Sequence, residues 1–201
     1  MENEERPSGH ISINVYFKGF SVVECLIAAI CMLIPLFLFL ADSKNLRASI
    51  SNYAYMQDSY IFGMLLTMAA MLFLMNGALY LQVRNIKQQK RHGRWYNMVL
   101  GGALFGVVLF PHQEHVFVHY LFALLFFIGS AIVIALFHEP KHRKPSILIA
   151  LLSLSGLAVY ASNTWFIPIP FTGWVTLLLA EWLSLFVIGV HYILEASGKL
   201  T

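Results

Sequence analysis

The chain has 201 residues, of which 59% are hydrophobic and only 11% are charged, and its net charge is +3. Soluble domains carry about 25% charged residues, so this composition excludes an ordinary water-soluble protein. A membrane-spanning helix needs about 20 apolar residues, and six such helices with short connections use nearly the whole chain. The sequence therefore predicts an all-α, multi-pass integral membrane protein without a separate soluble domain.

Six apolar stretches mark the expected transmembrane helices in chain order. Lipid cannot hydrogen-bond an exposed backbone, so such a stretch crosses the membrane as a helix that satisfies its own N–H and C=O groups. We expect a single six-transmembrane-helix bundle over residues 19–195, with a tail over residues 1–18 and another over residues 196–201. The predicted spans cover residues 19–40, 59–81, 96–111, 113–137, 146–163 and 172–195.

Positive charge is distributed unevenly between the two sides of this predicted bundle. All of the 13 Lys and Arg residues except Lys44 and Arg47 lie in alternate connections or in the tails. The positive-inside rule assigns the more basic side to the cytoplasm, so we expect both termini to be cytoplasmic and the protein to lie in the plasma or inner membrane. We expect the basic residues to contact membrane lipids through anionic headgroups, and we expect no binding of nucleic acid.

The third predicted span carries two small residues at helical spacing. Gly102 and Gly106 are four residues apart, and such a pair lets a neighbouring helix approach closely. The neighbour is either another helix of the same chain or a second copy of the protein in a homo-oligomer.

Three histidines lie where the third predicted span passes into the fourth. Pro111 suits the first residue of a helix, because its missing N–H would be unpaired there in any case. With about 100° of rotation per residue, His112, His115 and His119 then share one helical face. His115 and His119 also have the i, i+4 spacing that lets two imidazoles reach one divalent metal ion such as zinc.

A metal ion at this position needs a further ligand from elsewhere in the chain. His112, Asp58 just before the second span, and Glu181 in the sixth span are the candidates, and we take His115, His119 and Glu181 as the predicted ligand set. The alternative is a hydrogen-bonded group of histidines that holds no metal and titrates near neutral pH.

Glu181 is the acidic residue that the sequence places deepest in the predicted bundle. It lies about 13 Å from the outer start of its span, at 1.5 Å per residue. An acid at that depth must face the bundle interior, a partner or water. We predict either a proton carrier, ligand or catalytic acid, or a hydrogen-bonded link to a neighbouring helix.

Other polar residues within the spans have simpler expectations. Glu24, about one turn inside the first span, is expected to extend its carboxylate to the cytoplasmic interface. His191 and Glu195, spaced i, i+4, are expected to form a local pair. Asn76 is expected to hydrogen-bond to another helix.

Five segments in the middle of the chain form a recognisable series: 49–53 (SISNY), 60–64 (YIFGM), 101–111 (GGALFGVVLFP), 119–123 (HYLFA) and 126–129 (FFIG). The series resembles the DUF998 and Frag1/DRAM/Sfk1 group of six-span membrane proteins over about 90 residues from Ser49 onward, and its best part is the order Phe-Pro, then His, then Phe-Phe-x-Gly. This resemblance implies a six-helix bundle with both ends cytoplasmic. It implies little biochemistry, although eukaryotic members of the group are associated with lipid-anchor remodelling or membrane homeostasis.

Together these features predict a protein that engages lipid in a polar pocket facing the outer leaflet. Two alternatives remain open at this point. One is a metal-dependent hydrolase that acts on a lipid, in which a bound cation activates water, and the other is a small proton-coupled transporter that uses Glu181 and His119. The residues predicted to border the pocket are Asp58, His112, His115, His119 and Glu181.

Overall fold

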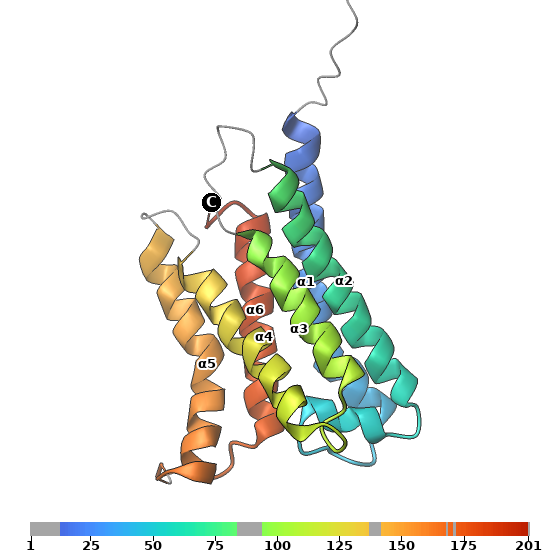
Figure 1. The fold of residues 1–201 in the computed structure, drawn as a ribbon. Coiled ribbons are helices and arrows are strands. Elements are labelled where there is room, and N and C mark those ends of the chain that lie inside the picture. Colours follow the sequence, from blue (N-terminus) through green and yellow to red (C-terminus); the bar gives the residue numbers. More distant parts are fainter. Residues whose placement is uncertain (1–12, 84–93, 137–141, 168, 171, 201) are drawn as a thin grey trace, which may run out of the picture.

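Within the part of the chain that the structure describes, six α-helices run alternately in opposite directions (Figure 1). The computed structural model describes residues 13–83, 94–136, 142–167, 169–170 and 172–200. Two short 3-10 helices, η1 (Ile50–Tyr55) and η2 (Arg94–Tyr96), precede the second and third α-helices. The α-helices are α1 (Ile13–Ala41), α2 (Ser59–Val83), α3 (Asn97–Leu109), α4 (Val116–Leu136), α5 (Arg143–Trp165) and α6 (Leu177–Ala196).

Each helix packs against its neighbours in the chain, and the first helix also packs against the last. Contacts join α1 to α2, α2 to α3, α3 to α4, α4 to α5 and α5 to α6, and the packing of α1 on α6 closes the circle. The start of α1 and the end of α6 lie at one end of the bundle, which we call the terminal end (Figure 1). The opposite end carries η1 and the connections 110–115 and 166–176, and we call it the loop end.

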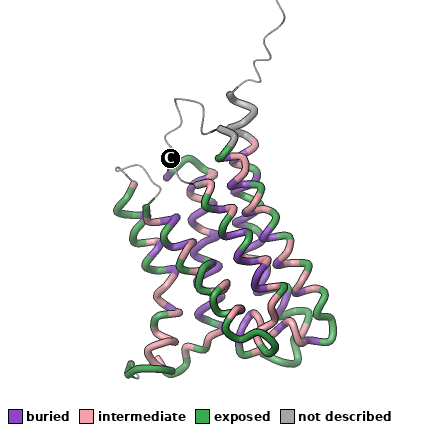
Figure 2. Tube along the Cα trace, viewed as in Figure 1, coloured by how far each residue is buried: buried purple, intermediate pink, exposed green. Residues whose placement is uncertain are grey.

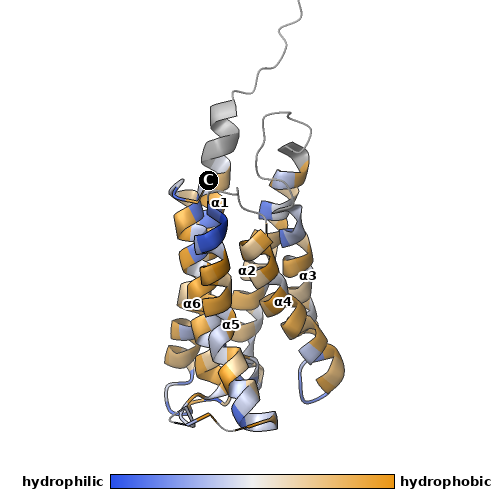
Figure 3. Cartoon of the chain, turned by 90° about the vertical axis from the view of Figure 1, so that its left-hand side faces the viewer, coloured by the Kyte–Doolittle hydropathy of each residue, from blue (hydrophilic) through white to orange (hydrophobic). Residues whose placement is uncertain are grey.

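Apolar side chains cover both the inside and the outside of this bundle. On α1, Ile27 and Leu38 are completely buried, whereas Leu26 and Leu36 are about half exposed. Buried positions line the interior (purple in Figure 2), and the helices between the two ends consist largely of hydrophobic residues (orange in Figure 3), many of which are exposed. Helices that are apolar on all sides belong to a large core or to a membrane, and the outward-facing surface of a bundle this small fits lipid.

Five of the helices are long and apolar enough to cross a membrane, and the third is shorter. The five are the segments Gly19–Ala41, Ser59–Leu81, Val116–Leu136, Arg143–Trp165 and Leu177–Ala196. Helix α3 has 13 residues, or about 20 Å at 1.5 Å per residue, against a hydrocarbon layer of about 30 Å. The structure thus contains helices near all six predicted positions, but only five of them have the length of a full span. The basic segment 84–93, Lys141 and Arg6 lie outside the described residues.

Helix α3 is held closely between α2 and α4 at two glycines. A Cβ added to Gly101 would lie 2.7 Å from the backbone oxygen of Ala70 on α2, and one added to Gly106 would overlap the ring of Phe122 on α4. A Cβ added to Gly102 would meet nothing within 4 Å. The close-packed pair is therefore Gly101 and Gly106, which face two different helices, rather than the predicted pair of Gly102 and Gly106 on one face.

Candidate functional site

Glu181 connects the first connection at the loop end to the start of α6. Its Oε2 atom accepts a hydrogen bond of 2.6 Å from the backbone N–H of Ile50, the first residue of η1. Nearby, the backbone N–H of Leu178 donates to the carbonyl of Ala48 at 3.1 Å. A helical N-terminus carries unpaired N–H groups and attracts negative charge, so a carboxylate is well suited to hold η1 in place. Of the two roles predicted for Glu181, this contact corresponds to the hydrogen-bonded link.

The three histidines do not share one helical face, because α4 begins later than predicted. The helix starts at Val116 rather than near Pro111, and His112 and His115 belong to the turn that precedes it. His119 is buried, and its Nδ1 donates to the carbonyl of Phe110 at 2.8 Å. His115 is exposed, with its ring 5.5 Å from the ring of Phe110.

A small cavity lies in the middle of the bundle between His119 and Glu181. Its volume is about 50 Å³, enough for a few water molecules, and both of these side chains line it. Cys31 on α1 and Ser51 in η1 are the other lining residues that can hydrogen-bond, and the rest of the lining is apolar. We call this space the central cavity.

A second and much larger space opens at the loop end, between α4 and α5. These two helices lie side by side at the terminal end and diverge toward the loop end (Figures 1 and 3). The space between them has a volume of about 640 Å³, and η1 and the start of α6 complete its walls. We call it the loop-end cleft. Its polar lining residues are Ser49, Asn52, His112, Tyr120, Tyr160, Asn163, Thr164 and Thr176.

The 3-10 helix η1 separates the cleft from the central cavity. Ile50 and Ser51 face the cavity, whereas Ser49 and Asn52 line the cleft. The histidines divide in the same way, since His119 lines the cavity and His112 lines the cleft. The single polar pocket predicted from the sequence is therefore two separate spaces in the structure.

The predicted metal ligands are not gathered around one point. Among the residues that the structure describes, no group of three His, Cys, Asp or Glu side chains is placed to hold a metal ion. Asp58 is exposed and lines neither the cavity nor the cleft; its backbone oxygen accepts from Ile61 N–H at the start of α2. The set of His115, His119 and Glu181 thus remains a sequence prediction without a matching geometry in the described chain.

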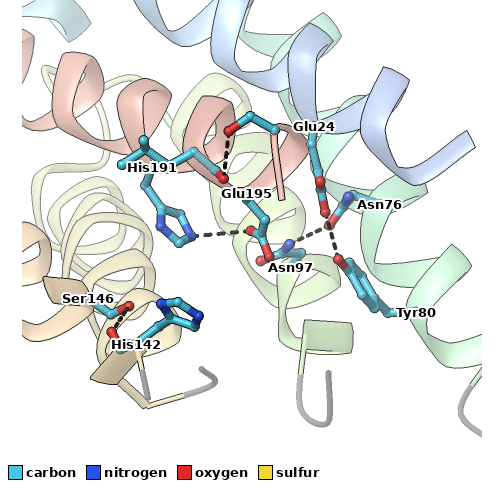
Figure 4. A network of polar contacts seen from close by, with 10 residues as sticks. Glu24, Asn76, Tyr80, Asn97, His142, Ser146, His191 and Glu195 are labelled. Atoms are coloured by element: carbon cyan, nitrogen blue, oxygen red, sulfur yellow. Dashed lines mark hydrogen bonds and ion pairs between the residues drawn. The ribbon is translucent and has the colours of Figure 1, made fainter. Parts of the chain in front are cut away.

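A group of buried polar side chains lies nearer the terminal end (Figure 4). Tyr80 on α2 donates to Glu24 on α1 at 2.6 Å. On α6, His191 Nε2 lies 3.3 Å from Glu195 Oε2, which confirms the predicted local pair. The side chains of Glu24, His191 and Glu195 are almost completely buried. The expectation that Glu24 extends to the interface is wrong, because its carboxylate turns inward to a tyrosine.

An amide pair in the same region joins α2 to the start of α3. Asn97 donates from its side-chain nitrogen to the side-chain oxygen of Asn76 at 2.6 Å, and both residues are buried (Figure 4). This contact confirms the predicted interhelical role of Asn76. The sequence contained a signal for Glu24 as well, since that residue lies at i+4 from buried Phe20 and at i−3 from buried Ile27, on the inward stripe of α1.

The fold and its buried polar groups define an all-helical bundle with five helices that could span a membrane. The chain belongs to the DUF7103 family, described as a family of unknown function, whose model matches residues 33–196. No curated protein matches the chain. No solved structure matches it either.

The family match corrects the resemblance drawn from the sequence. The DUF998 and Frag1/DRAM/Sfk1 assignment is wrong, because the model that matches belongs to a different family. The segments behind that assignment combine glycines, phenylalanines and a proline turn at the end of an apolar helix. Membrane helices in general are rich in Gly and Pro and carry aromatic residues at their ends, so these segments do not identify one family.

Proposed function

We propose that the protein is an integral membrane protein whose terminal end faces the cytoplasm. Two observations support insertion in a membrane: five helices have the length and composition of spans, and apolar side chains cover the outside of the bundle. The orientation rests on the positive-inside rule, because most Lys and Arg residues belong to the tails and connections of the terminal end. At the loop end, Trp165 and Trp174 are about 70% exposed, as tryptophans are at a membrane–water interface.

Cysteine labelling in intact cells tests this orientation. In a background that lacks Cys25 and Cys31, we expect Asn45→Cys, at the exposed loop end, to react with a maleimide that cannot cross membranes. Lys199→Cys, exposed at the terminal end, is expected to react only after the cells are opened. The reverse pattern would overturn the orientation, and reaction of both cysteines in intact cells would contradict a membrane-spanning bundle.

We further infer that the loop-end cleft binds the headgroup of a membrane lipid. The proposal rests on the position of the loop-end cleft. This cleft has polar lining residues and a volume of about 640 Å³, and it lies where α4 and α5, two otherwise apolar helices, diverge. Small-molecule sites usually enclose about 300–1,000 Å³. Leu121 and Leu124 on α4 and Leu152 on α5 are at least half exposed. The acyl chains of a lipid whose headgroup lies in the loop-end cleft would therefore have apolar surface to contact on these two helices.

A glycine in the wall of the cleft allows the proposal to be tested by blocking the site. Gly173 lines the cleft, and a Cβ added there would meet nothing within 4 Å. Gly173→Trp is therefore expected to fill the cleft without disturbing the backbone. Gly63 on α2 is equally open but lies outside the cleft, so Gly63→Trp is the matched control.

Native mass spectrometry of protein purified in mild detergent provides the measurement. We expect the wild-type protein and Gly63→Trp to retain a stoichiometric lipid and Gly173→Trp to lose it. A wild-type protein without retained lipid, or a Gly173→Trp variant that retains it fully, would overturn the lipid-binding proposal.

A further inference from the structure

We infer that the lipid recognised by the loop-end cleft carries an uncharged, hydroxyl-rich headgroup, such as the sugar of a glycosylated diacylglycerol. The inference rests on the proposed lipid-binding function and adds the chemical class of the ligand. Three properties of the cleft lead to it: no Lys, Arg, Asp or Glu among the described lining residues, a mixture of hydrogen-bonding groups, and hydrogen bonds that tie part of the lining to α5.

No Lys, Arg, Asp or Glu residue is found among the described residues that line the cleft. The nearest basic residue in the sequence is Arg47, beside the lining residue Ala48, and its guanidinium group is already paired with Asp42. Its Nε donates to Asp42 Oδ2 at 2.6 Å, and this hydrogen bond lowers the pKa of Asp42. Asp42 therefore stays ionised at neutral pH and keeps Arg47 paired. A phosphate in the cleft would find no Lys or Arg among the described lining residues, and an unpaired charge away from bulk water is unfavourable.

The groups that do line the cleft suit hydroxyl ligands. Asn52, Tyr120, Tyr160 and Thr164 line the cleft, and their amide and hydroxyl groups can both donate and accept hydrogen bonds. A sugar hydroxyl also donates and accepts, so it can pair with groups of either kind. The two tyrosine rings add flat apolar surface, which fits the C–H face of a sugar ring.

One side chain ties two described residues beside the cleft to the end of α5. Asn163 accepts from the backbone N–H of Ile169 at 2.8 Å and donates to the carbonyl of Thr172 at 3.0 Å. Ile169 lines the cleft, and Thr172 precedes the lining residue Gly173. Lining residues that are held before a ligand arrives reduce the ordering that binding requires.

The test compares two lipids with identical acyl chains, monoglucosyl diacylglycerol and phosphatidylglycerol, with phosphatidylcholine as a third probe. Each is added to delipidated full-length protein at pH 8, above the range in which histidine side chains normally titrate, and binding is followed by native mass spectrometry. We expect the wild-type protein to bind the glucosyl lipid at least about tenfold more tightly than phosphatidylglycerol, a difference of roughly 1.4 kcal/mol.

Placing a cation in the cleft provides the complementary variant. Thr164→Lys adds an ammonium group at an exposed lining position and is expected to remove most of the preference against phosphatidylglycerol. Ser59→Lys adds the same group at an exposed loop-end position outside the cleft and is expected to leave the preference unchanged.

The possible outcomes separate the inference from the function on which it rests. Equal or tighter binding of phosphatidylglycerol or phosphatidylcholine by the wild-type protein, blocked by Gly173→Trp, would overturn the uncharged-headgroup inference and leave the cleft as a lipid site. Binding of none of the three lipids, or binding that Gly173→Trp does not reduce, would overturn the proposed function itself.

Discussion

Replacing Glu181 with alanine is expected to lower the free energy of unfolding in detergent by about 1–3 kcal/mol, the usual cost of leaving a buried hydrogen-bonding group without its partner. The substitution removes the acceptor for the Ile50 N–H, which is buried with its partner at 2.6 Å. Thermal unfolding followed by circular dichroism, with limited proteolysis of the segment 42–58, gives the measurement. We expect faster cleavage in this segment, because η1 loses its attachment to α6.

The conservative variant Glu181→Gln distinguishes an anchoring role from a proton-carrying role. Glutamine retains an oxygen that can accept from Ile50 N–H, so it is expected to restore most of the stability lost in Glu181→Ala. If glutamine is as destabilising as alanine, the hydrogen bond to η1 does not explain the role of Glu181. Glu181 and His119 both line the central cavity. If Glu181 also carries protons in a proton-coupled transporter, uptake driven by a pH gradient is expected to be lost in liposomes that contain Glu181→Gln.

Alanine at Gly101 is expected to destabilise the protein by about 1–3 kcal/mol, as overpacking in a close-packed core usually does. The added Cβ would lie 2.7 Å from the backbone oxygen of Ala70, and a backbone atom within a helix cannot move aside as a flexible side chain can. Helices α2 and α3 would have to separate. The measurement is the midpoint of thermal unfolding in the same detergent.

The adjacent residue offers a matched control for this substitution. Gly102 is exposed and has open space where a Cβ would lie, so Gly102→Ala is expected to leave stability unchanged or to raise it by up to about 1 kcal/mol through helix propensity. Equal effects at the two positions would show that the contact with Ala70 does not limit the packing of α3.

The helices could be predicted from the sequence because each depends on its own residues. A continuous apolar stretch of sufficient length forms a helix whatever its neighbours do, and all six predicted positions contain one. The end of the third span was predicted at residue 111, whereas α3 ends at Leu109, where Phe110 and Pro111 lead into a turn.

The arrangement of the candidate site depends on contacts between distant residues, and these were not visible in the sequence. The separation of the cavity from the cleft follows from the position of η1, which is set by a hydrogen bond from Ile50 to Glu181, 131 residues further along the chain. The late start of α4 places His112 and His115 in the turn before the helix, although the ring of His112 still lies 5.8 Å from that of His119. The carboxylate of Glu24 turns inward to a hydrogen bond with Tyr80 on another helix. The position of Glu24 on the buried stripe of α1 indicated that it is buried, but not which residue is its partner.

The closure of the bundle by α1 and α6 has a consequence for how the protein is made. Synthesis proceeds from the N-terminus, so α1 leaves the ribosome long before the helix that covers its inner face and anchors the backbone of η1. Until α6 has been synthesised, the Ile50 N–H lacks its acceptor, Glu181. Truncation within α6 is therefore expected to leave an assembly intermediate that quality-control proteases degrade, rather than a slightly shorter native protein.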